Sequence, residues 1–172
     1  MISVKKLTYC SIFIAIAMIL SQLKLFSLPQ GGSVTACSSM FISLLGYWFG
    51  LPIGILSGTV FGLLRLISGP TIVHPAQFVL DYILAFAALG LSGLFRNVKS
   101  GLYLGYVSGM LGMLIVNTAS GYIFFRSYAP EGMHPLFYSL SYNSSYIIPE
   151  MLMCLVIFNI PAIKNVIYRV NI

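Results

Sequence analysis

Charged side chains are scarce in this sequence. Only 7% of the 172 residues are Asp, Glu, Lys or Arg, and only three of these are acidic. A soluble globular domain carries roughly 25% charged residues, because its surface must be solvated by water. Hydrophobic residues make up 59% of the chain, which indicates a surface that contacts membrane lipid. We therefore expect an integral membrane protein, and a single domain over residues 1–172 because no linker divides the chain.

The sequence also lacks the patterns that metal binding, ATP hydrolysis or nucleophilic catalysis requires. The three cysteines and two histidines do not have the spacing of metal ligands. There is no G-x-x-x-x-G-K-[ST] loop, and no serine lies in a recognisable nucleophile elbow. The lysines and arginines are dispersed at the ends of apolar segments, so they do not indicate a nucleic-acid partner. We expect no metal, no cofactor and no catalytic residue, and hence a protein that is not an enzyme.

Turn residues divide the apolar sequence into six stretches, which we interpret as six transmembrane helices. A span needs about 20 apolar residues, and a chain of this length with short loops holds roughly six. The longest connection, 126–144, contains Pro130, Gly132 and Pro135 and is predicted to be a folded outer loop. The six predicted spans cover residues 7–26, 36–50, 51–68, 76–95, 102–125 and 145–163.

Basic residues predict the orientation of the bundle, because positive charges near the ends of spans resist translocation and stay in the cytoplasm. With six spans, most of the basic residues fall at one end. This arrangement predicts that both termini and the loop after the fourth span are cytoplasmic, and that the 126–144 connection is outside. The basic residues at the cytoplasmic end are Lys5, Lys6, Arg96, Lys99, Lys164 and Arg169.

Three charged side chains fall inside predicted spans, namely Arg65, Asp81 and Glu150. Each costs at least about 2.5–3.5 kcal/mol to insert, so such residues usually mark a functional site. Because alternate spans run in opposite directions, the three share one depth, in the outer third of the bundle. Asn117 reaches the same level, and Gln77 lies one turn from Asp81 on the same helix face. Four helices therefore contribute polar groups to one layer.

The polar layer has more than one interpretation. Arg65 could neutralise either Asp81 or Glu150 in an interhelical ion pair that fixes packing. Such a pair leaves one carboxylate over, and we favour Asp81 as the ligand partner and Glu150 as a structural residue. A protein of a different class, a membrane enzyme, would use Asp81 or Glu150 as an acid or base. A self-sufficient channel or ion-coupled carrier is a third possibility.

Aromatic residues crowd the same outer region. A carboxylate surrounded by rings suits a flat, positively charged heterocycle, because stacking and cation–π attraction strengthen once the ligand is desolvated. The alternative is an aromatic belt at the membrane interface, which is how we interpret the segment 47–49 at the cytoplasmic end. The outer aromatic residues are Tyr82, Tyr122, Phe124, Phe125, Tyr128, Phe137, Tyr138, Tyr142 and Tyr146.

Small residues recur at four-residue spacing in the first and third predicted spans. Such stripes let helix backbones approach closely, since lipid offers no hydrophobic drive for helices to associate. We expect the third-span stripe of Gly54, Gly58 and Gly62 to pack internally. The first-span pair, Ser11 and Ala15, could pack internally or face another membrane protein.

Three separated segments resemble the thiamine-specific substrate-binding subunit, or S component, of energy-coupling factor (ECF) vitamin transporters. They are 28–34 (LPQGGSV), 74–82 (HPAQFVLDY) and 127–143, which contains SYAPEG and YSLSYN. The segments occur in the order of the family, the likeness covers nearly the whole chain, and the family has six helices. The resemblance implies an all-α ECF S-component fold in a bacterial cell membrane.

The resemblance also implies a function and its partners. The subunit would capture thiamine from outside for ATP-driven uptake by a transmembrane coupling subunit and two ATPase subunits. Ser11 and Ala15 occupy the places that contact the coupling subunit, and the loop of Gln30, Gly31, Gly32 and Ser33 would close over the pocket. The positions implied to bind the substrate are Asp81, Tyr82, Asn117, Phe125, Tyr138 and Asn143.

Two of these positions depart from the family pattern. Asn117 stands where relatives carry His, and Phe125 stands where some carry Trp; a basic residue of relatives is also missing around Met113. Asn still forms hydrogen bonds and Phe still stacks, so a heterocycle pocket remains. The ligand is therefore expected to be thiamine, or a thiamine precursor or analogue such as a free aminopyrimidine.

Overall fold

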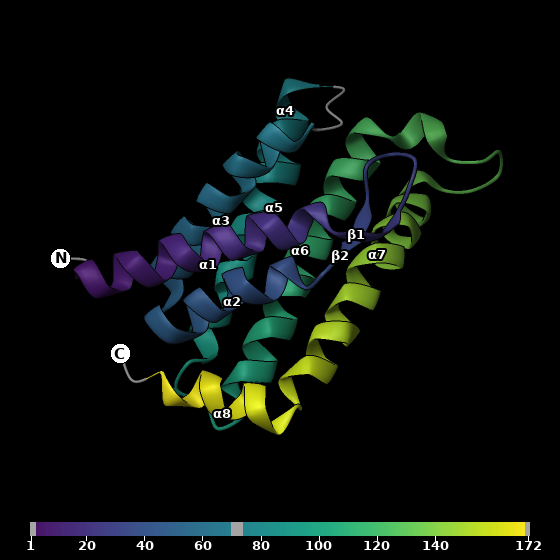
Figure 1. The fold of residues 1–172 in the computed structure, drawn as a ribbon. Helices are drawn as coiled ribbons and strands as arrows, with labels where there is room; N and C mark the ends of the chain where they lie inside the picture. The colour runs from purple at the N-terminus through teal and green to yellow at the C-terminus, as the bar shows by residue number, and fades with distance from the viewer. Residues whose placement is uncertain (1–2, 70–73, 171–172) are drawn as a thin grey trace.

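The structure is a computed structural model that describes residues 3–69 and 74–170, and it consists of long helices and one short β-hairpin (Figure 1). Within these residues, five helical segments are long and apolar enough to cross a membrane. They are α1 (Val4–Gln22), α3 (Leu51–Arg65) with η1 (Leu66–Ser68), a rod over Pro75–Phe95, α6 (Gly101–Phe124) and α7 (Pro135–Phe158).

The remaining predicted span is α2 (Ser38–Phe49), an apolar helix of 12 residues. At a rise of 1.5 Å per residue it is about 18 Å long, whereas the hydrocarbon core of a bilayer is about 30 Å thick. Each of the six predicted spans thus corresponds to an apolar helix, and the predicted all-α membrane fold is confirmed. The second helix is shorter than a full crossing.

The first predicted span, 7–26, extends beyond the C-terminal end of the observed helix. Helix α1 ends at Gln22, and the chain then forms an antiparallel hairpin of β1 (Lys24–Ser27) and β2 (Ser33–Thr35). Its turn is closed by the amide of Leu28, which donates to the carbonyl of Gly32 over 2.7 Å. Gly31 has φ 92°, a conformation that glycine adopts without steric strain. The breaker residues after residue 28 therefore make a tight turn between strands instead of a simple interhelical loop.

The last predicted span was shifted along the chain. Helix α7 begins at Pro135, ten residues earlier than predicted, so the folded outer loop is limited to 126–134 and includes η4 (Arg126–Tyr128). Proline suits the first helical position, and Nδ1 of His134 accepts from the amide of Leu136 over 3.2 Å. The early turns of α7 carry polar residues for the cavity described below, which is why their composition resembled a loop.

A short helix that was not predicted follows α7. Helix α7 ends at Phe158, and α8 (Pro161–Arg169) begins within the segment assigned to the last span. Its Ile167 is buried, and the indole N–H of Trp48 donates to the Ile167 carbonyl over 3.1 Å. Helix α8 is thereby held against α2.

The rod after residue 74 changes its winding along its length. It consists of α4 (Pro75–Phe78), the π-helical segment η2 (Val79–Leu84), α5 (Ala85–Ala88) and the 3-10 helical segment η3 (Leu89–Phe95). A π turn is wider than an α turn, and such turns occur frequently at functional sites. Asp81 and Tyr82 lie in the π-helical segment.

Three glycines of α3 bring that helix against the rod. Gly54, Gly58 and Gly62 are buried, as predicted. A Cβ atom at Gly58 would collide with the backbone carbonyl of Phe86, and one at Gly62 with that of Tyr82. Glycine is needed here because the backbones touch directly. The stripe therefore positions the π-helical segment that carries Asp81.

Replacing Gly58 with alanine is expected to destabilise the protein by about 1–3 kcal/mol, the usual penalty for overpacking an interior. The added methyl group meets backbone, which has no alternative rotamer. The melting temperature in detergent measures this effect. Gly112→Ala is the matched control, because the nearest neighbours of its Cβ would be side-chain atoms, the movable end of Leu91 and the Cβ of Ala88, rather than backbone. Equal melting temperatures for the two variants would contradict this account of the packing.

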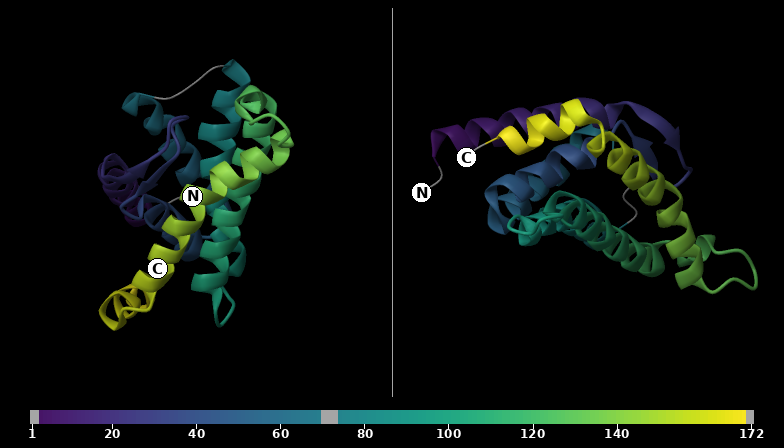
Figure 2. Two further views of the ribbon diagram at one scale, coloured as in Figure 1. Left: turned by 90° about the vertical axis from the view of Figure 1, so that its right-hand side faces the viewer. Right: turned by 90° about the horizontal axis from the view of Figure 1, so that it is seen from below.

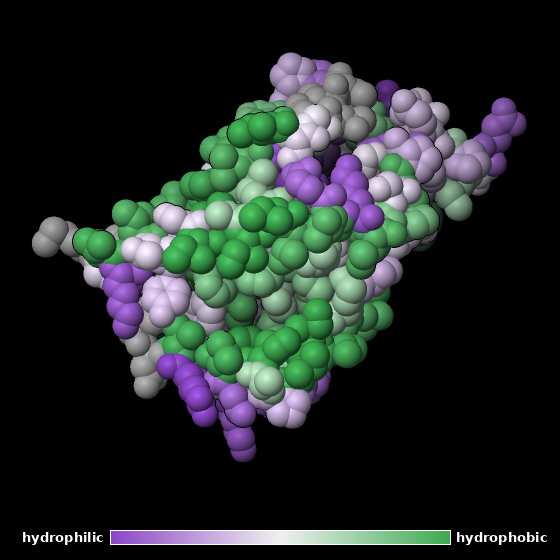
Figure 3. Space-filling view, in the orientation of Figure 1, coloured by the Kyte–Doolittle hydropathy of each residue, from purple (hydrophilic) through white to green (hydrophobic). Residues whose placement is uncertain are grey.

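The two chain termini lie at one end of the bundle, and the hairpin and the α6–α7 connection lie at the other (Figures 1 and 2). Lys6 lies 5.9 Å from the centre of the Phe49 ring, and Lys164 lies 5.7 Å from that of Tyr103. Figure 3 shows hydrophobic residues over the middle of one face and hydrophilic residues toward its two ends. This is the surface pattern of a multi-pass membrane protein.

Candidate functional site

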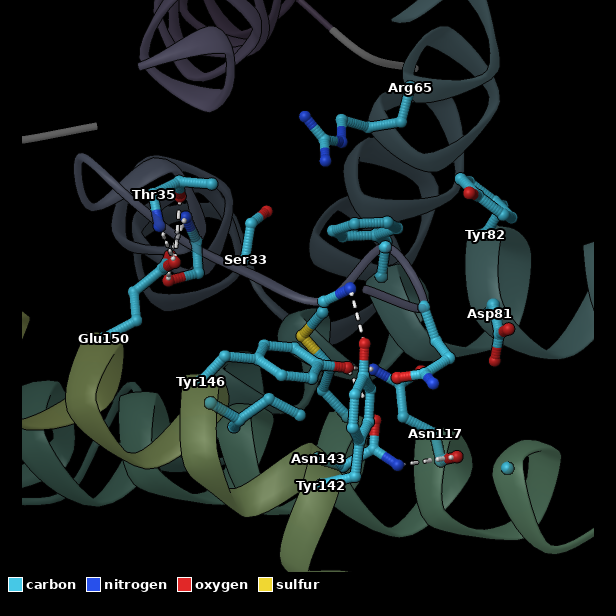
Figure 4. A pocket seen from close by; sticks show the side chains of 18 of the residues that line it. Ser33, Thr35, Arg65, Asp81, Tyr82, Asn117, Tyr142, Asn143, Tyr146 and Glu150 are labelled. Carbon is cyan, nitrogen blue, oxygen red and sulfur yellow. Dashed lines mark hydrogen bonds between the residues drawn. The ribbon is translucent and has the colours of Figure 1, made fainter. Parts of the chain in front are cut away.

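A cavity of about 200 Å³ opens at the end of the bundle opposite the termini, between the hairpin, α3, η2, α6 and α7 (Figure 4). A cavity that holds one buried water has a volume of roughly 10–15 Å³, so this cavity can hold a small organic molecule. Every residue predicted to bind the substrate or to form the closing loop lines it. These residues are Gln30, Gly31, Gly32, Ser33, Asp81, Tyr82, Asn117, Phe125, Tyr138 and Asn143.

Asp81 supplies a carboxylate on the η2 side of the cavity. The side-chain amide of Gln77 donates to Asp81 Oδ2 over 3.0 Å, as expected for residues one turn apart. Tyr82 is the next residue and also lines the cavity, where the π-helical winding presents both consecutive side chains. This side of the cavity therefore joins a negative charge to an aromatic ring.

The opposite wall contains a hydrogen-bonded chain between α6 and α7. Asn117 Nδ2 donates to the hydroxyl of Tyr146 over 3.2 Å, and that hydroxyl donates to Asn143 Oδ1 over 2.6 Å. Asn143 Nδ2 donates to the carbonyl of Ser139 over 2.9 Å and to that of Asn117 over 3.2 Å. Asn143 thus joins the two helices, while Asn117 Oδ1 is buried and accepts no hydrogen bond from the described residues.

Glu150 has a structural role at the edge of the cavity. Its carboxylate accepts from the amide and hydroxyl of Thr35 over 2.9 and 2.8 Å, and from the hydroxyl of Ser39 over 2.7 Å. The Ser39 amide adds a longer bond of 3.3 Å. Glu150 therefore joins the end of β2 and the start of α2 to α7, consistent with its predicted structural role.

Arg65 does not form either of the ion pairs considered from the sequence, within the described part of the chain. Its Nη1 donates to the backbone carbonyl of Ser21 over 3.1 Å, and the side chain lines the cavity. Figure 4 shows Arg65 extending from α3, with Asp81 on one side and Glu150 on the other. The arginine therefore remains a charged group of the cavity wall.

The turn of the hairpin covers the cavity. The amide of Gly32 donates to the hydroxyl of Tyr142 over 3.0 Å. Gly32 is buried, and a Cβ atom there would lie 2.7 Å from the ring of Tyr146. The turn is thus fastened to α7 at a position where a larger residue would displace it.

Several residues of the cavity were not assigned from the sequence as ligand-binding or closing-loop residues. Tyr142 and Tyr146 were named only as members of the aromatic cluster, yet with Ser139 and Asn143 they repeat at helical spacing on one face of α7. That periodicity was a usable signal, but it was obscured when 126–144 was assigned to a loop. No sequence signal pointed to Thr35 or Ser39 as partners of Glu150, because those contacts join residues more than 100 positions apart.

Ser11 and Ala15 lie away from the cavity. Both are exposed on α1, and the Ser11 hydroxyl donates to the carbonyl of Leu7 over 3.0 Å. Ala17, in contrast, is fully buried. Of the two packing alternatives for this pair, the internal one is excluded within the described chain, and the small residues form an outer surface.

Comparisons with known proteins agree with this architecture. The thiamine transporter ThiT of Bacillus subtilis is 36% identical over 145 residues, which cover 76% of this chain and 75% of that protein. The thiamine transporter ThiT of Lacticaseibacillus paracasei is 29% identical over 119 residues, or 59% of each chain. A solved structure of ThiT from Listeria monocytogenes has the same fold, with a TM-score of 0.79 at 23% identity, covering 89% of this chain and 90% of that one.

The family comparison covers nearly the whole sequence. The model of the thiamine transporter protein family (Thia_YuaJ) matches residues 7–169. The family resemblance indicated by the three sequence segments is thereby confirmed. Because the members of this family are transporters, the comparison does not support the membrane-enzyme alternative. The chain belongs to the thiamine transporter protein (Thia_YuaJ) family.

Proposed function

We propose that the chain is the S component of an ECF-type importer and captures thiamine from the extracellular side. The observation that carries this proposal is the covered cavity, which is lined by Asp81, by aromatic rings and by the polar residues Asn117 and Asn143. Both curated relatives are named thiamine transporters, which supports thiamine as the ligand. The chain has no ATP-binding loop, so uptake would depend on partner ATPases.

The roles of the cavity residues follow from their chemistry. Asp81 accepts hydrogen bonds from the aminopyrimidine of thiamine or attracts its positive charge. Tyr82 and Phe125 stack on the rings of the ligand. Asn117, Tyr138 and Asn143 form the polar wall that hydrogen-bonds the ligand. The second candidate ligand, a free aminopyrimidine, is favoured by the departures from the family pattern at Asn117, at Phe125 and around Met113.

The proposed orientation has both termini in the cytoplasm and the cavity facing outside. It is supported by the basic residues at the terminal end of the bundle and by the hairpin at the other end. Exposed Ser11 and Ala15 on α1 would face the transmembrane coupling subunit, with which two ATPases assemble. Accessibility labelling of single cysteines near each terminus in intact cells tests this orientation, and labelling from outside would contradict it.

Titrating the purified protein with thiamine and its pyrimidine half, and then analysing the recovered ligand, tests the function. We expect saturable binding of thiamine and its return unchanged. Altered ligand would indicate an enzyme instead. Vesicles that contain this chain alone are expected to show no uptake, because the energising subunits are absent; uptake by the chain alone would indicate an independent carrier.

The Gly32–Tyr142 hydrogen bond provides a test of the closing loop. Tyr142→Phe should weaken the attachment of the turn by about 0.5–1.5 kcal/mol, the net value of one hydrogen bond. Pulsed hydrogen exchange should then show faster exchange of the Gly32 amide in the ligand-bound protein. Tyr122→Phe is the control, because Tyr122 is exposed and does not line the cavity. Ligand binding without protection of residues 30–33 in the wild type would contradict loop closure.

A further inference from the structure

A second cavity of about 200 Å³ lies at the end of the bundle where the two chain termini lie, opposite the cavity proposed to hold thiamine. Its walls come from three parts of the chain, namely the last turn of α2, the turn that follows η3, and α8. The indole N–H of Trp48 donates to the Ile167 carbonyl over 3.1 Å, which joins two of these walls. The lining residues are Tyr47, Trp48, Arg96, Asn97, Ile167, Tyr168 and Val170.

Helix α8 places this cavity at the surface of the bilayer. With nine residues it is too short to cross the hydrocarbon core, which takes about 20 residues. Figure 1 shows it running across the end of the bundle at an angle to α7. Its apolar residues Ile163, Val166 and Ile167 recur at helical spacing between polar ones, as in helices that lie in the membrane interface. The cavity therefore opens among lipid head groups.

Arg96 brings a positive charge to this cavity that the described residues do not balance. The acidic side chains lie elsewhere, because Asp81 and Glu150 line the other cavity and Glu131 belongs to the α6–α7 connection. Arg96 also forms no side-chain hydrogen bond within residues 3–69 and 74–170. A Cβ atom at Gly50 would lie 3.1 Å from Arg96 Nη1, so the guanidinium lies against the backbone between α2 and α3. An anion that pairs with this guanidinium must therefore come from outside the described chain.

The other polar groups of the cavity suit a phosphodiester. The hydroxyls of Tyr47 and Tyr168 and the side-chain amide of Asn97 form no hydrogen bond to any residue that the structure describes. Together with the guanidinium they offer several donors to the oxygens of a phosphate group. Lipid phosphates are the anions that surround a membrane protein at this depth. A choline head group would add a positive charge beside Arg96, whereas a glycerol head group leaves the lipid with a net negative charge.

We propose that this cavity binds the head group of an anionic phospholipid. Arg96 pairs with the phosphodiester, and Asn97 donates to the same group. The hydroxyls of Tyr47 and Tyr168 complete the site, and the exposed side chain of Leu94 offers apolar surface to an acyl chain. The bound lipid joins α8 to α2 and to the turn after η3. The inference goes beyond the proposed function, because it depends neither on the thiamine cavity nor on the orientation of the protein in the membrane.

Native mass spectrometry of the delipidated protein, titrated in detergent with dioleoyl phosphatidylglycerol or dioleoyl phosphatidylcholine, tests the site. The apparent Kd is obtained from the fraction of protein that retains one lipid molecule, and the wild type should bind phosphatidylglycerol more tightly. Arg96→Gln should raise the Kd for phosphatidylglycerol about five- to tenfold, the scale of one charged contact at a membrane surface. Lys99→Gln is the matched control, because Lys99 is exposed three residues away and does not line the cavity. It should leave this Kd unchanged.

Each other outcome has a definite meaning. Equal losses of affinity in Arg96→Gln and Lys99→Gln would show that general surface charge attracts the lipid, and equal binding of the two lipids would likewise overturn the site. Displacement of phosphatidylglycerol by soluble glycerol 3-phosphate would assign the cavity to a free phosphate ester instead. Tyr168→Phe removes one hydroxyl and should raise the Kd about threefold, so it decides the matter if Arg96→Gln does not fold. Thiamine binding by Arg96→Gln should equal that of the wild type, so failure of this inference leaves the proposed function standing.

Discussion

Asp81→Asn is expected to weaken thiamine binding by about 10- to 100-fold, or about 1.5–3 kcal/mol, the range for a hydrogen bond to a charged group. Asparagine has nearly the same shape, but it has no negative charge and presents an amide donor where the carboxylate accepts. Its amide would also face the side-chain amide of Gln77, which now donates to Asp81 Oδ2. Isothermal titration calorimetry on the purified variant measures the loss.

Glu131→Gln is the matched control for Asp81→Asn. Glu131 is an exposed acid in the α6–α7 connection and does not line the cavity. Both variants remove one negative charge from the same end of the protein, so a general electrostatic effect would appear in both. Wild-type affinity in a well-folded Asp81→Asn protein would mean that the acid is structural.

Glu150→Ala is expected to lower the free energy of unfolding by about 3 kcal/mol or more, because hydrogen bonds to a buried charged group contribute about 1.5–3 kcal/mol each. Alanine would leave the amide of Thr35 without its acceptor, and the hydroxyl of Ser39 would keep only the hydroxyl of Tyr106 as its partner. The first turn of α2 and the end of β2 would lose their connection to α7 through Glu150, while the hydrogen bond between Gly32 and Tyr142 would remain. A large fall in melting temperature, together with weakened ligand binding, is the expected measurement.

A double-mutant cycle separates this network from simple loss of volume. Once Ser39 is alanine, the further change Glu150→Ala should cost less than it does in the wild type, since contacting residues are not additive. Glu150→Gln keeps the shape and one acceptor oxygen, so it should lie between the wild type and alanine. Strict additivity of Ser39→Ala and Glu150→Ala would show that the hydrogen bonds do not hold the segments together.

The membrane fold could be predicted because lipid imposes strong constraints on sequence. Long apolar segments separated by Gly and Pro left few alternatives to a helical bundle. The boundaries were less accurate where polar residues lie inside a helix. The segment 135–144 was assigned to a loop together with Pro130, Gly132 and Pro135, yet it belongs to α7 and several of its polar residues line the cavity. Composition does not distinguish a solvated loop from the polar face of a helix.

The sequence predicted which residues line the candidate site, but it did not predict which residues they contact. Shared depth correctly brought Asp81 and Asn117 to one cavity, because antiparallel spans fix which residues lie at the same level. The partner of Glu150 could not be found in this way, since Thr35 and Ser39 reach it only through the course of the hairpin. The π-helical segment at Asp81 likewise packs its backbone at Tyr82 against Gly62 of α3, a contact that the local sequence does not reveal.

The most direct test of the central claim is a structure of the protein crystallised with thiamine. We expect ligand density in the cavity beneath the hairpin, with the aminopyrimidine within hydrogen-bond distance of Asp81 and a ring stacked on Tyr82 or Phe125. Thiamine bound at another surface, or an empty cavity at saturating thiamine, would contradict the account.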